Sequence, residues 1–261
     1  MSADASPPTA EVVVEEHGEI LVVSINRPHR RNAVNRAVSE QIAAALDRLD
    51  TRDDLAVGIL TGSGGTFCAG MDLRAFLSGE SPTLPDRGFA GVTGRPPAKP
   101  LIAAVEGHAI AGGFEIVLAC DLIVAATDAV FGVPEVRRGL TPAGGALFNL
   151  PRRIPFHKAM EMVLTGDLVM ASRAAEFGLV NRLVEPGTAL QEALGLAGAV
   201  ARNGPLAVAA SKAVLRISQD WPLAEGFERQ RPWTDPVRES EDAREGARAF
   251  TEKRDPVWRR R

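Results

Sequence analysis

Two glutamates stand in segments rich in small or rigid residues, and they lie 20 residues apart in the chain. Glu115 closes the segment 111–115 (Ala-Gly-Gly-Phe-Glu), and Glu135 closes the segment 133–135 (Val-Pro-Glu). Two carboxyl groups that share a pocket push their proton affinities apart, so that one can act as an acid while the other acts as a base. Addition or removal of water needs this division, and the sequence therefore predicts a site with two carboxylates.

Two stretches of backbone could complete such a site. The segment 68–74 (Cys-Ala-Gly-Met-Asp-Leu-Arg) follows an apolar strand expected at 57–60, and the segment 111–115 opens a helix expected at 112–120. Small residues in both let a ligand approach backbone N–H groups. Two such donors aimed at a carbonyl oxygen stabilise an enolate, by about 2.7–4 kcal/mol per donor in mutagenesis of other enzymes. We therefore expect an oxyanion hole beside the glutamates.

Other chemistry finds little support in the sequence. The segment 65–70 has the glycine spacing of a phosphate-binding loop, but Met71 and Asp72 replace the Lys-Ser/Thr pair that would hold phosphate and magnesium. The four histidines are scattered without the spacing of metal ligands. We therefore expect neither nucleotide hydrolysis nor a metal site.

The composition is that of an ordinary globular protein. Of the 261 residues, 45% are hydrophobic and 24% are charged, and the net charge of −3 gives no general attraction to nucleic acid.

No apolar run reaches the roughly 18 residues of a membrane helix. Residues 1–8 lack the features of a secretory signal, and we interpret them as a frayed tail of a cytoplasmic protein. Cys68 and Cys120 are expected to be buried free thiols.

The hydrophobic pattern predicts an α/β protein in two parts, a core at 1–200 and a helical subdomain at 201–261. Glycines and prolines make 78–99 an expected irregular, mobile lid. The expected strands are 11–15, 20–25, 57–60, 100–105 and 121–126. The expected helices are one capped by Asn35, then 112–120, 143–150, 156–164, 171–177, 206–217, 223–230 and 236–250.

Four segments in order, 67–73, 99–105, 111–115 and 131–135, resemble the enoyl-CoA hydratase (crotonase) superfamily. The similarity extends over nearly the whole chain, from 25–28 to 250–254. It implies a spiral of ββα repeats with a C-terminal helical trimerisation region, and assembly as a homotrimer or as a hexamer of paired trimers. It also implies a coenzyme A thioester as substrate. No separate cofactor is expected, because coenzyme A is part of that substrate.

The resemblance assigns roles to individual residues. The amides of Met71 and Gly112 would form the oxyanion hole, Glu115 would activate a water, and Glu135 would deliver a proton to the α-carbon. Arg31 and Ala33 lie in the segment that resembles the family's adenine contact, Arg74 would meet the phosphates, and the last contacts would come from the C-terminal region. The full set of expected substrate contacts is Arg31, Ala33, Ala69, Gly70, Asp72, Leu73, Arg74, Phe250 and Lys253.

Each assignment has a simpler structural alternative. A glutamate in the first turn of a helix often stabilises only that helix, which applies to Glu115. Glu135, after a proline in a turn, could be a solvated charge, and Arg74 and Lys253 could be ordinary surface cations. Four positions depart from the family pattern, namely Met71, Glu106, His108 and Ala111. These departures predict a pocket whose shape differs from the common one.

Three classes of function remain open. The first is hydration of a trans-2-enoyl-CoA. The second is another crotonase-family reaction, such as double-bond isomerisation, thioester hydrolysis or the crotonobetainyl-CoA hydratase reaction, which the segments 88–91, 240–246 and 253–258 resemble. The third is a non-catalytic acyl-CoA binder whose trimer is its function. The preferred acyl chain is expected to depend on the segment 78–99.

Overall fold

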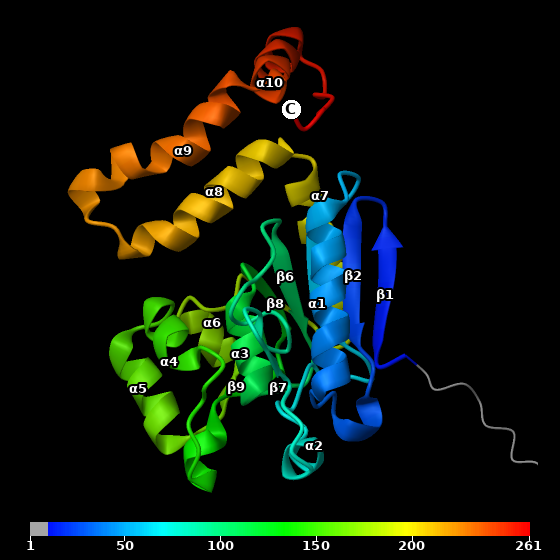
Figure 1. Cartoon of the computed structure of the whole chain (residues 1–261), viewed down its shortest axis with the longest axis vertical. Coiled ribbons are helices and arrows are strands. Elements are labelled where there is room, and N and C mark those ends of the chain that lie inside the picture. Colours follow the sequence, from blue (N-terminus) through cyan, green and yellow to red (C-terminus); the bar gives the residue numbers. More distant parts are fainter. Residues whose placement is uncertain (1–9) are drawn as a thin grey trace, which may run out of the picture.

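The computed structural model describes residues 10–261, so the prediction for the first eight residues lies outside the described part. A twisted sheet of six strands runs through the core, with helices on both faces (Figure 1). The strand order is β1-β2-β3-β6-β8-β11, in which β1 and β2 are antiparallel and the other neighbours are parallel. The strands are β1 Val12–His17, β2 Ile20–Ile25, β3 Val57–Gly62, β6 Leu101–Val105, β8 Leu122–Ala126 and β11 Arg182–Val184.

Strands β2, β3, β6 and β8 are buried on both faces, which explains their continuous apolar character, whereas the edge strand β11 is largely exposed. Alternate residues of β2 divide between two clusters, because side chains of a strand point to opposite faces. Leu21 and Val23 pack with helix α1 (Arg36–Thr51), and Ile20 and Val22 pack with helix α7 (Ala189–Ala201). The sheet is therefore the middle layer of the core.

Helix α1 begins where the sequence predicts. The side chain of Asn35 accepts a hydrogen bond from the Val38 amide at 2.9 Å and caps the first turn. One face of the helix then buries Ile42, Leu46 and Leu49 against the sheet. The hairpin predicted around Gly18 is also present, as β1 and β2.

A smaller sheet, with the order β10-β9-β7, lies beside the main one. Its strands are β7 His108–Ile110, β9 Val130–Gly132 and β10 Val169–Met170. Neither these strands nor β11 was predicted, because runs of two or three residues carry no readable hydrophobic period. The remaining elements of this region are α3 Gly112–Ala119, η2 Pro134–Arg138, α4 Ala146–Asn149, η3 Leu150–Arg152, α5 Phe156–Thr165 and α6 Ala171–Glu176.

The segment expected to be an irregular lid contains a short hairpin and is packed against α1. Its strands are β4 Thr83–Leu84 and β5 Gly88–Phe89. The hydroxyl of Ser39 on α1 donates to the Pro82 carbonyl at 2.6 Å, and the buried Arg87 pairs with Asp47. Gly91 approaches α1 so closely that a Cβ there would lie 2.4 Å from the Ser39 carbonyl. These contacts fix the hairpin beside the loop 68–74.

The C-terminal helices project away from the sheet as an arm (Figure 1). They are α8 Pro205–Ile217, η4 Ser218–Asp220, η5 Leu223–Glu225, α9 Gly226–Glu239 and α10 Glu241–Glu252. The prediction of two helices separated between 230 and 236 was wrong, since α9 runs through Pro232 and Pro236. The chain instead breaks at Ser240, whose hydroxyl accepts from the Ala243 amide at 3.0 Å and starts α10.

Asp121 joins this arm to the core. Its carboxylate accepts from the Leu101 amide at 2.8 Å, from Lys212 of α8 at 2.6 Å and from Arg216 of α8 at 2.8 Å. Arg216 also donates to the carbonyl of Ala119, the last residue of α3. A cation is favourable at this negative end of a helix. The base of the arm is thus held to the sheet and to α3 at once.

Within residues 10–261, no single helix is long and apolar enough to cross a membrane. Helix α7 and the stretch 205–220 reach that length and apolar character only together, and the chain bends by 108° between them.

Candidate active site

Helix α3 holds Glu115 inside the protein. All eight residues of the helix are buried, and Glu115 is only 4% exposed. The helix can start here because its first residues lack side chains: a Cβ on Gly113 would lie 2.1 Å from the Cys68 carbonyl, and one on Gly112 would lie 2.5 Å from the Phe89 ring. The glycines therefore let the positive end of the helix touch the loop 68–74.

The two amides expected to form an oxyanion hole are neighbours in space. Val34 forms a parallel bridge with Met71. The Val34 amide donates to the Gly70 carbonyl at 2.8 Å, and the Asp72 amide donates to the Val34 carbonyl at 2.9 Å. The Met71 amide consequently points away from Val34. Gly112 is the first residue of α3, so its amide has no acceptor within the helix. Neither amide donates to another group among residues 10–261.

A close approach of backbone brings these amides together. Gly70 has φ +94°, a conformation that other residues rarely adopt, and a Cβ there would lie 3.2 Å from the Gly112 nitrogen. Both Met71 and Gly112 line one cavity of about 480 Å³. Two free N–H groups therefore face the same space, which is the arrangement that stabilises a developing oxyanion.

The same cavity receives both glutamates. Its other walls come from the loop 68–74, from the hairpin β4–β5 and from the segment that follows η2, and the side chains among them are mostly apolar. The remaining lining residues are Ala69, Leu73, Phe76, Thr83, Gly88, Phe89, Thr93, Gly94, Ile110, Ala111, Pro134, Arg138, Leu140, Thr141, Ala143, Gly144, Gly145 and Phe148.

Glu115 is fixed by two backbone donors. Its Oε1 accepts from the Gly144 amide at 2.7 Å and from the Ala146 amide at 3.1 Å. Burial raises its pKa to about 7, and the negative charge of Glu135 adds to this, while the Ala146 and Gly144 amides act in the opposite direction. A carboxyl with a pKa near neutrality can take up and release a proton during turnover.

Glu135 occupies the first turn of η2, just after Pro134. Burial raises its pKa, while its own backbone amide and the charge of Arg138 act in the opposite direction. Its Oε2 is buried and has no hydrogen-bond partner within residues 10–261. A buried polar atom without a partner is costly unless a ligand or water satisfies it. The unpaired oxygen therefore marks a place where a polar reactant would be bound.

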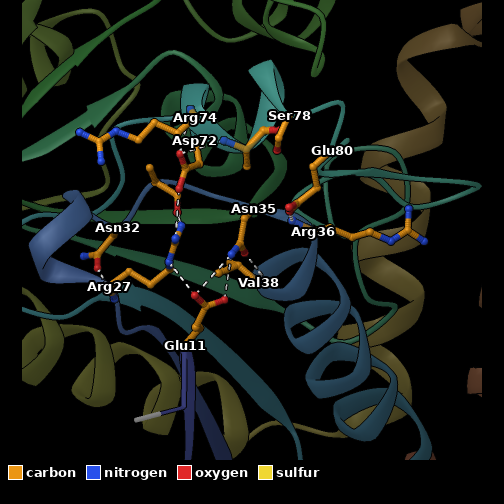
Figure 2. Close-up of polar contacts among 12 residues, drawn as sticks. Glu11, Arg27, Asn32, Asn35, Arg36, Val38, Asp72, Arg74, Ser78 and Glu80 are labelled. Atoms are coloured by element: carbon orange, nitrogen blue, oxygen red, sulfur yellow. Dashed lines mark hydrogen bonds and ion pairs between the residues drawn. The ribbon is translucent and has the colours of Figure 1, made fainter. Parts of the chain in front are cut away.

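The loop that carries Met71 is held from behind by an ion pair (Figure 2). Asp72 accepts from the Arg74 amide at 3.1 Å and caps α2 (Leu73–Leu77). Its other oxygen accepts from Arg27 at 3.0 Å, and Arg27 also pairs with Glu11 at 2.9 Å. Asp72 was expected to contact the substrate, but its side chain is turned to these partners and does not line the cavity. In the structure Asp72 supports the loop 68–74.

The other expected residues divide between the cavity and the surface. Ala69 and Leu73 line the cavity, as do Met71, Gly112, Glu115 and Glu135, whereas Gly70 lies behind it. Arg31, Ala33 and Arg74 lie outside the lining, and the two arginines are exposed. Phe250 is 87% exposed and lies on α10 near Lys253, in the arm that projects from the opposite end of the molecule to α2 (Figure 1).

Several lining residues could not be predicted from local sequence patterns. Phe89 lies in a segment without a hydrophobic period. Its place in the cavity wall depends on its close approach to Gly112 of α3. Gly144 contacts Glu115 across 29 residues of chain, and no local pattern indicates such a contact. Arg138 was passed over although it lies three residues after Glu135, a spacing that a tight helical turn would place on one face.

The fold and the site thus define an α/β protein whose sheet supports one buried carboxyl, one half-buried carboxyl and two free backbone donors around one cavity. A family model described as Enoyl-CoA hydratase/isomerase matches residues 15–261. The chain belongs to this family, and its architecture is the crotonase fold.

Individual relatives agree with this. Enoyl-CoA hydratase EchA19 of Mycobacterium tuberculosis is 43% identical over 258 residues, which cover 96% of this chain and 97% of that protein. Carnitinyl-CoA dehydratase of Salmonella typhimurium is 41% identical over 255 residues, covering 94% and 97%. The crystal structure of enoyl-CoA hydratase EchA1 from Mycobacterium marinum aligns with a TM-score of 0.95 at 55% identity, covering 97% of this chain and all of that one.

Proposed function

We propose that this protein is an enoyl-CoA hydratase, which adds water reversibly across the 2,3 double bond of a trans-2-enoyl-CoA thioester. The observation that carries the proposal is the meeting of Glu115, Glu135 and the free amides of Met71 and Gly112 in one cavity. Coenzyme A enters as part of the substrate, and the reaction needs no separate cofactor.

The two amides act on the thioester carbonyl. Their N–H groups would donate hydrogen bonds to the carbonyl oxygen, and the positive end of α3 adds to the pull on its electrons. The β-carbon of the conjugated double bond then becomes electrophilic. Negative charge that develops on the oxygen during attack is stabilised by donors that are already in place, so no reorganisation is required at that moment.

The two carboxyls divide the proton transfers. Glu115 acts as the base toward a water, because the Gly144 and Ala146 amides hold its Oε1 and leave its Oε2 for that task. Glu135 delivers a proton to the α-carbon, and its buried Oε2 has no competing partner within residues 10–261. Near neutral pH a pair with raised pKa values can hold one proton between its members, which is the starting state that hydration requires.

The direct test is hydration of crotonyl-CoA, followed as loss of the ultraviolet absorbance of its conjugated double bond. The wild type should bleach the substrate, and Glu115→Gln or Glu135→Gln should each lower kcat on the order of 10²–10⁴-fold. Mass spectrometry should find a product heavier by one water. An unchanged mass would indicate isomerisation, and release of free coenzyme A would indicate thioester hydrolysis. If the wild type binds acyl-CoA without turning it over, the protein is a non-catalytic acyl-CoA binder.

We further propose that the active form is a homotrimer or a pair of trimers. Large apolar side chains are exposed along the arm, including Leu215, Leu223 and Phe227, and a second copy of the chain would cover them. Light scattering after gel filtration measures the assembly directly. A monomer at micromolar concentration would refute this part of the proposal.

We place the enzyme in fatty-acid metabolism in the cytoplasm. Cys68 and Cys120 are free and buried, in keeping with a compartment in which thiols stay reduced. Fractionation of cells that express the tagged protein would test the location.

A further inference from the structure

Arg138 is the only cation among the described residues that line the cavity. The other charged lining residues are the two glutamates, and the side chains around them are mostly apolar. Covering a cation with an alkyl chain is unfavourable unless the chain brings an acceptor. The presence of Arg138 therefore bears on which acyl groups the cavity accepts.

The geometry of η2 places Arg138 on the same face as Glu135. The two residues are three positions apart in a 3₁₀ helix, where side chains at that spacing are eclipsed. With a rise of roughly 2 Å per residue, Arg138 lies about 6 Å farther along the axis than Glu135. If Glu135 stands at the α-carbon, Arg138 stands a few bonds away, where the far part of a short acyl chain would lie.

Arg138 is free to bind a substrate group. It is exposed, and it forms no hydrogen bond or ion pair with any other residue in the described range 10–261. Its neighbour Arg137 is already engaged, since it pairs with Asp167 and donates to the Thr165 carbonyl at 3.0 Å. Only one of these two consecutive arginines thus faces the cavity with its donors unused.

We infer that Arg138 determines specificity, and that the cavity favours short enoyl-CoA substrates whose acyl chain ends in a carboxylate. This inference rests on the proposed function and adds a substrate class to it. The guanidinium would form charge-assisted hydrogen bonds with the terminal carboxylate. The two glutamates oppose a second anion less strongly than their number suggests, because burial raises the pKa of both and favours a shared proton.

The same charge acts against cationic acyl groups. Crotonobetainyl-CoA carries a quaternary ammonium next to its double bond, and an unpaired guanidinium on the cavity wall would repel it. The described lining offers it no acidic side chain beyond the two glutamates of the site. The cavity should therefore prefer acyl chains that end in a carboxylate, then neutral chains, and last chains that carry a cation.

The test compares three substrates, trans-2-hexenedioyl-CoA, trans-2-hexenoyl-CoA and crotonobetainyl-CoA. Wild type should show the highest kcat/KM for the first and the lowest for the third. Arg138→Gln should lower the ratio of the first to the second by roughly tenfold, the factor that corresponds to about 1.4 kcal/mol of lost interaction. Arg138→Lys keeps a positive charge and should retain part of the preference. Arg137→Gln, which removes an arginine outside the lining, should leave the ratio unchanged.

A binding measurement separates failure of this inference from failure of the proposed function. Calorimetry with adipyl-CoA and hexanoyl-CoA, which have no double bond to hydrate, measures the same preference without turnover. Tighter binding of adipyl-CoA by wild type, lost in Arg138→Gln, supports the inference even if no enoyl-CoA is hydrated. Equal affinity for the two ligands, or a preference that Arg138→Gln preserves, overturns it even if crotonyl-CoA is hydrated rapidly.

Discussion

Replacing Glu115 by glutamine should slow hydration strongly and, at alkaline pH, make the protein more stable. The carboxyl is buried, and ionisation there is unfavourable. Glutamine keeps the shape and an oxygen that can accept from the Gly144 and Ala146 amides, but it never ionises. The variant therefore removes a destabilising charge while it preserves the contacts.

The size of the effect follows from the pKa of Glu115. Its pKa rises from 4.5 to about 7 on folding. At about 1.36 kcal/mol per pKa unit, the ionised group lowers the free energy of unfolding by about 3 kcal/mol. The folded state binds the proton more tightly, so stability is retained below pH 4.5 and lost as pH rises through about 7.

The assay is urea unfolding at pH 5 and pH 8.5, at one protein concentration because the stability of an oligomer depends on it. The free energy of unfolding of Glu115→Gln minus that of wild type should grow by about 2–3 kcal/mol between these pH values. Glu185→Gln, which neutralises an exposed carboxylate, should show no such growth. A difference for Glu115→Gln that is equal at both pH values would refute the reasoning.

Three further predictions concern catalysis. Below pH 7, kcat/KM for hydration of crotonyl-CoA should fall about tenfold per pH unit, because Glu115 must be ionised to act as a base; a flat profile from pH 5 to 7 would contradict this. Gly144→Ala should lower kcat on the order of 10²-fold, since the new Cβ would lie 2.5 Å from Oε2 of Glu115 and displace it; Gly195→Ala, with nothing within 4 Å, is the matched control. Asp72→Asn should raise KM and cost about 1–3 kcal/mol of stability in urea, because Arg27 loses one of its two carboxylate partners beneath the loop 68–74; an unchanged KM would show that the ion pair does not position Met71.

Local signals predicted much of the fold. Asn35 caps α1 through the amide three residues later, and the hairpin turns at Gly18, so neighbouring residues contain the information. The site motifs were predictable for a similar reason, since the glycines before Glu115 serve a close approach of backbone. The short strands β7 and β9 carry too few residues for a pattern, and their formation depends on pairing with each other.

The parts of the site that were missed depend on distant segments. Burial of Glu115 requires the turn at 144–146, and the position of Phe89 requires the packing of its hairpin on α1. The role of Asp72 was assigned from its place in a motif, whereas the structure directs its carboxylate to Arg27, 45 residues earlier. A motif identifies which residues gather at a site, but the direction of each side chain is set by partners that the motif does not include.

The junction at Asp121 connects the C-terminal arm to α3, the helix that carries Gly112 and Glu115. Arg216 of the arm binds the carbonyl at the far end of α3, the helix whose near end supplies the Gly112 amide. A force that tilts α8 would therefore be transmitted to α3 and would shift the Gly112 amide at its start. In the proposed trimer, subunits docked on the arm would brace α3, so that assembly would bear on the position of the Gly112 amide through Asp121 and Arg216.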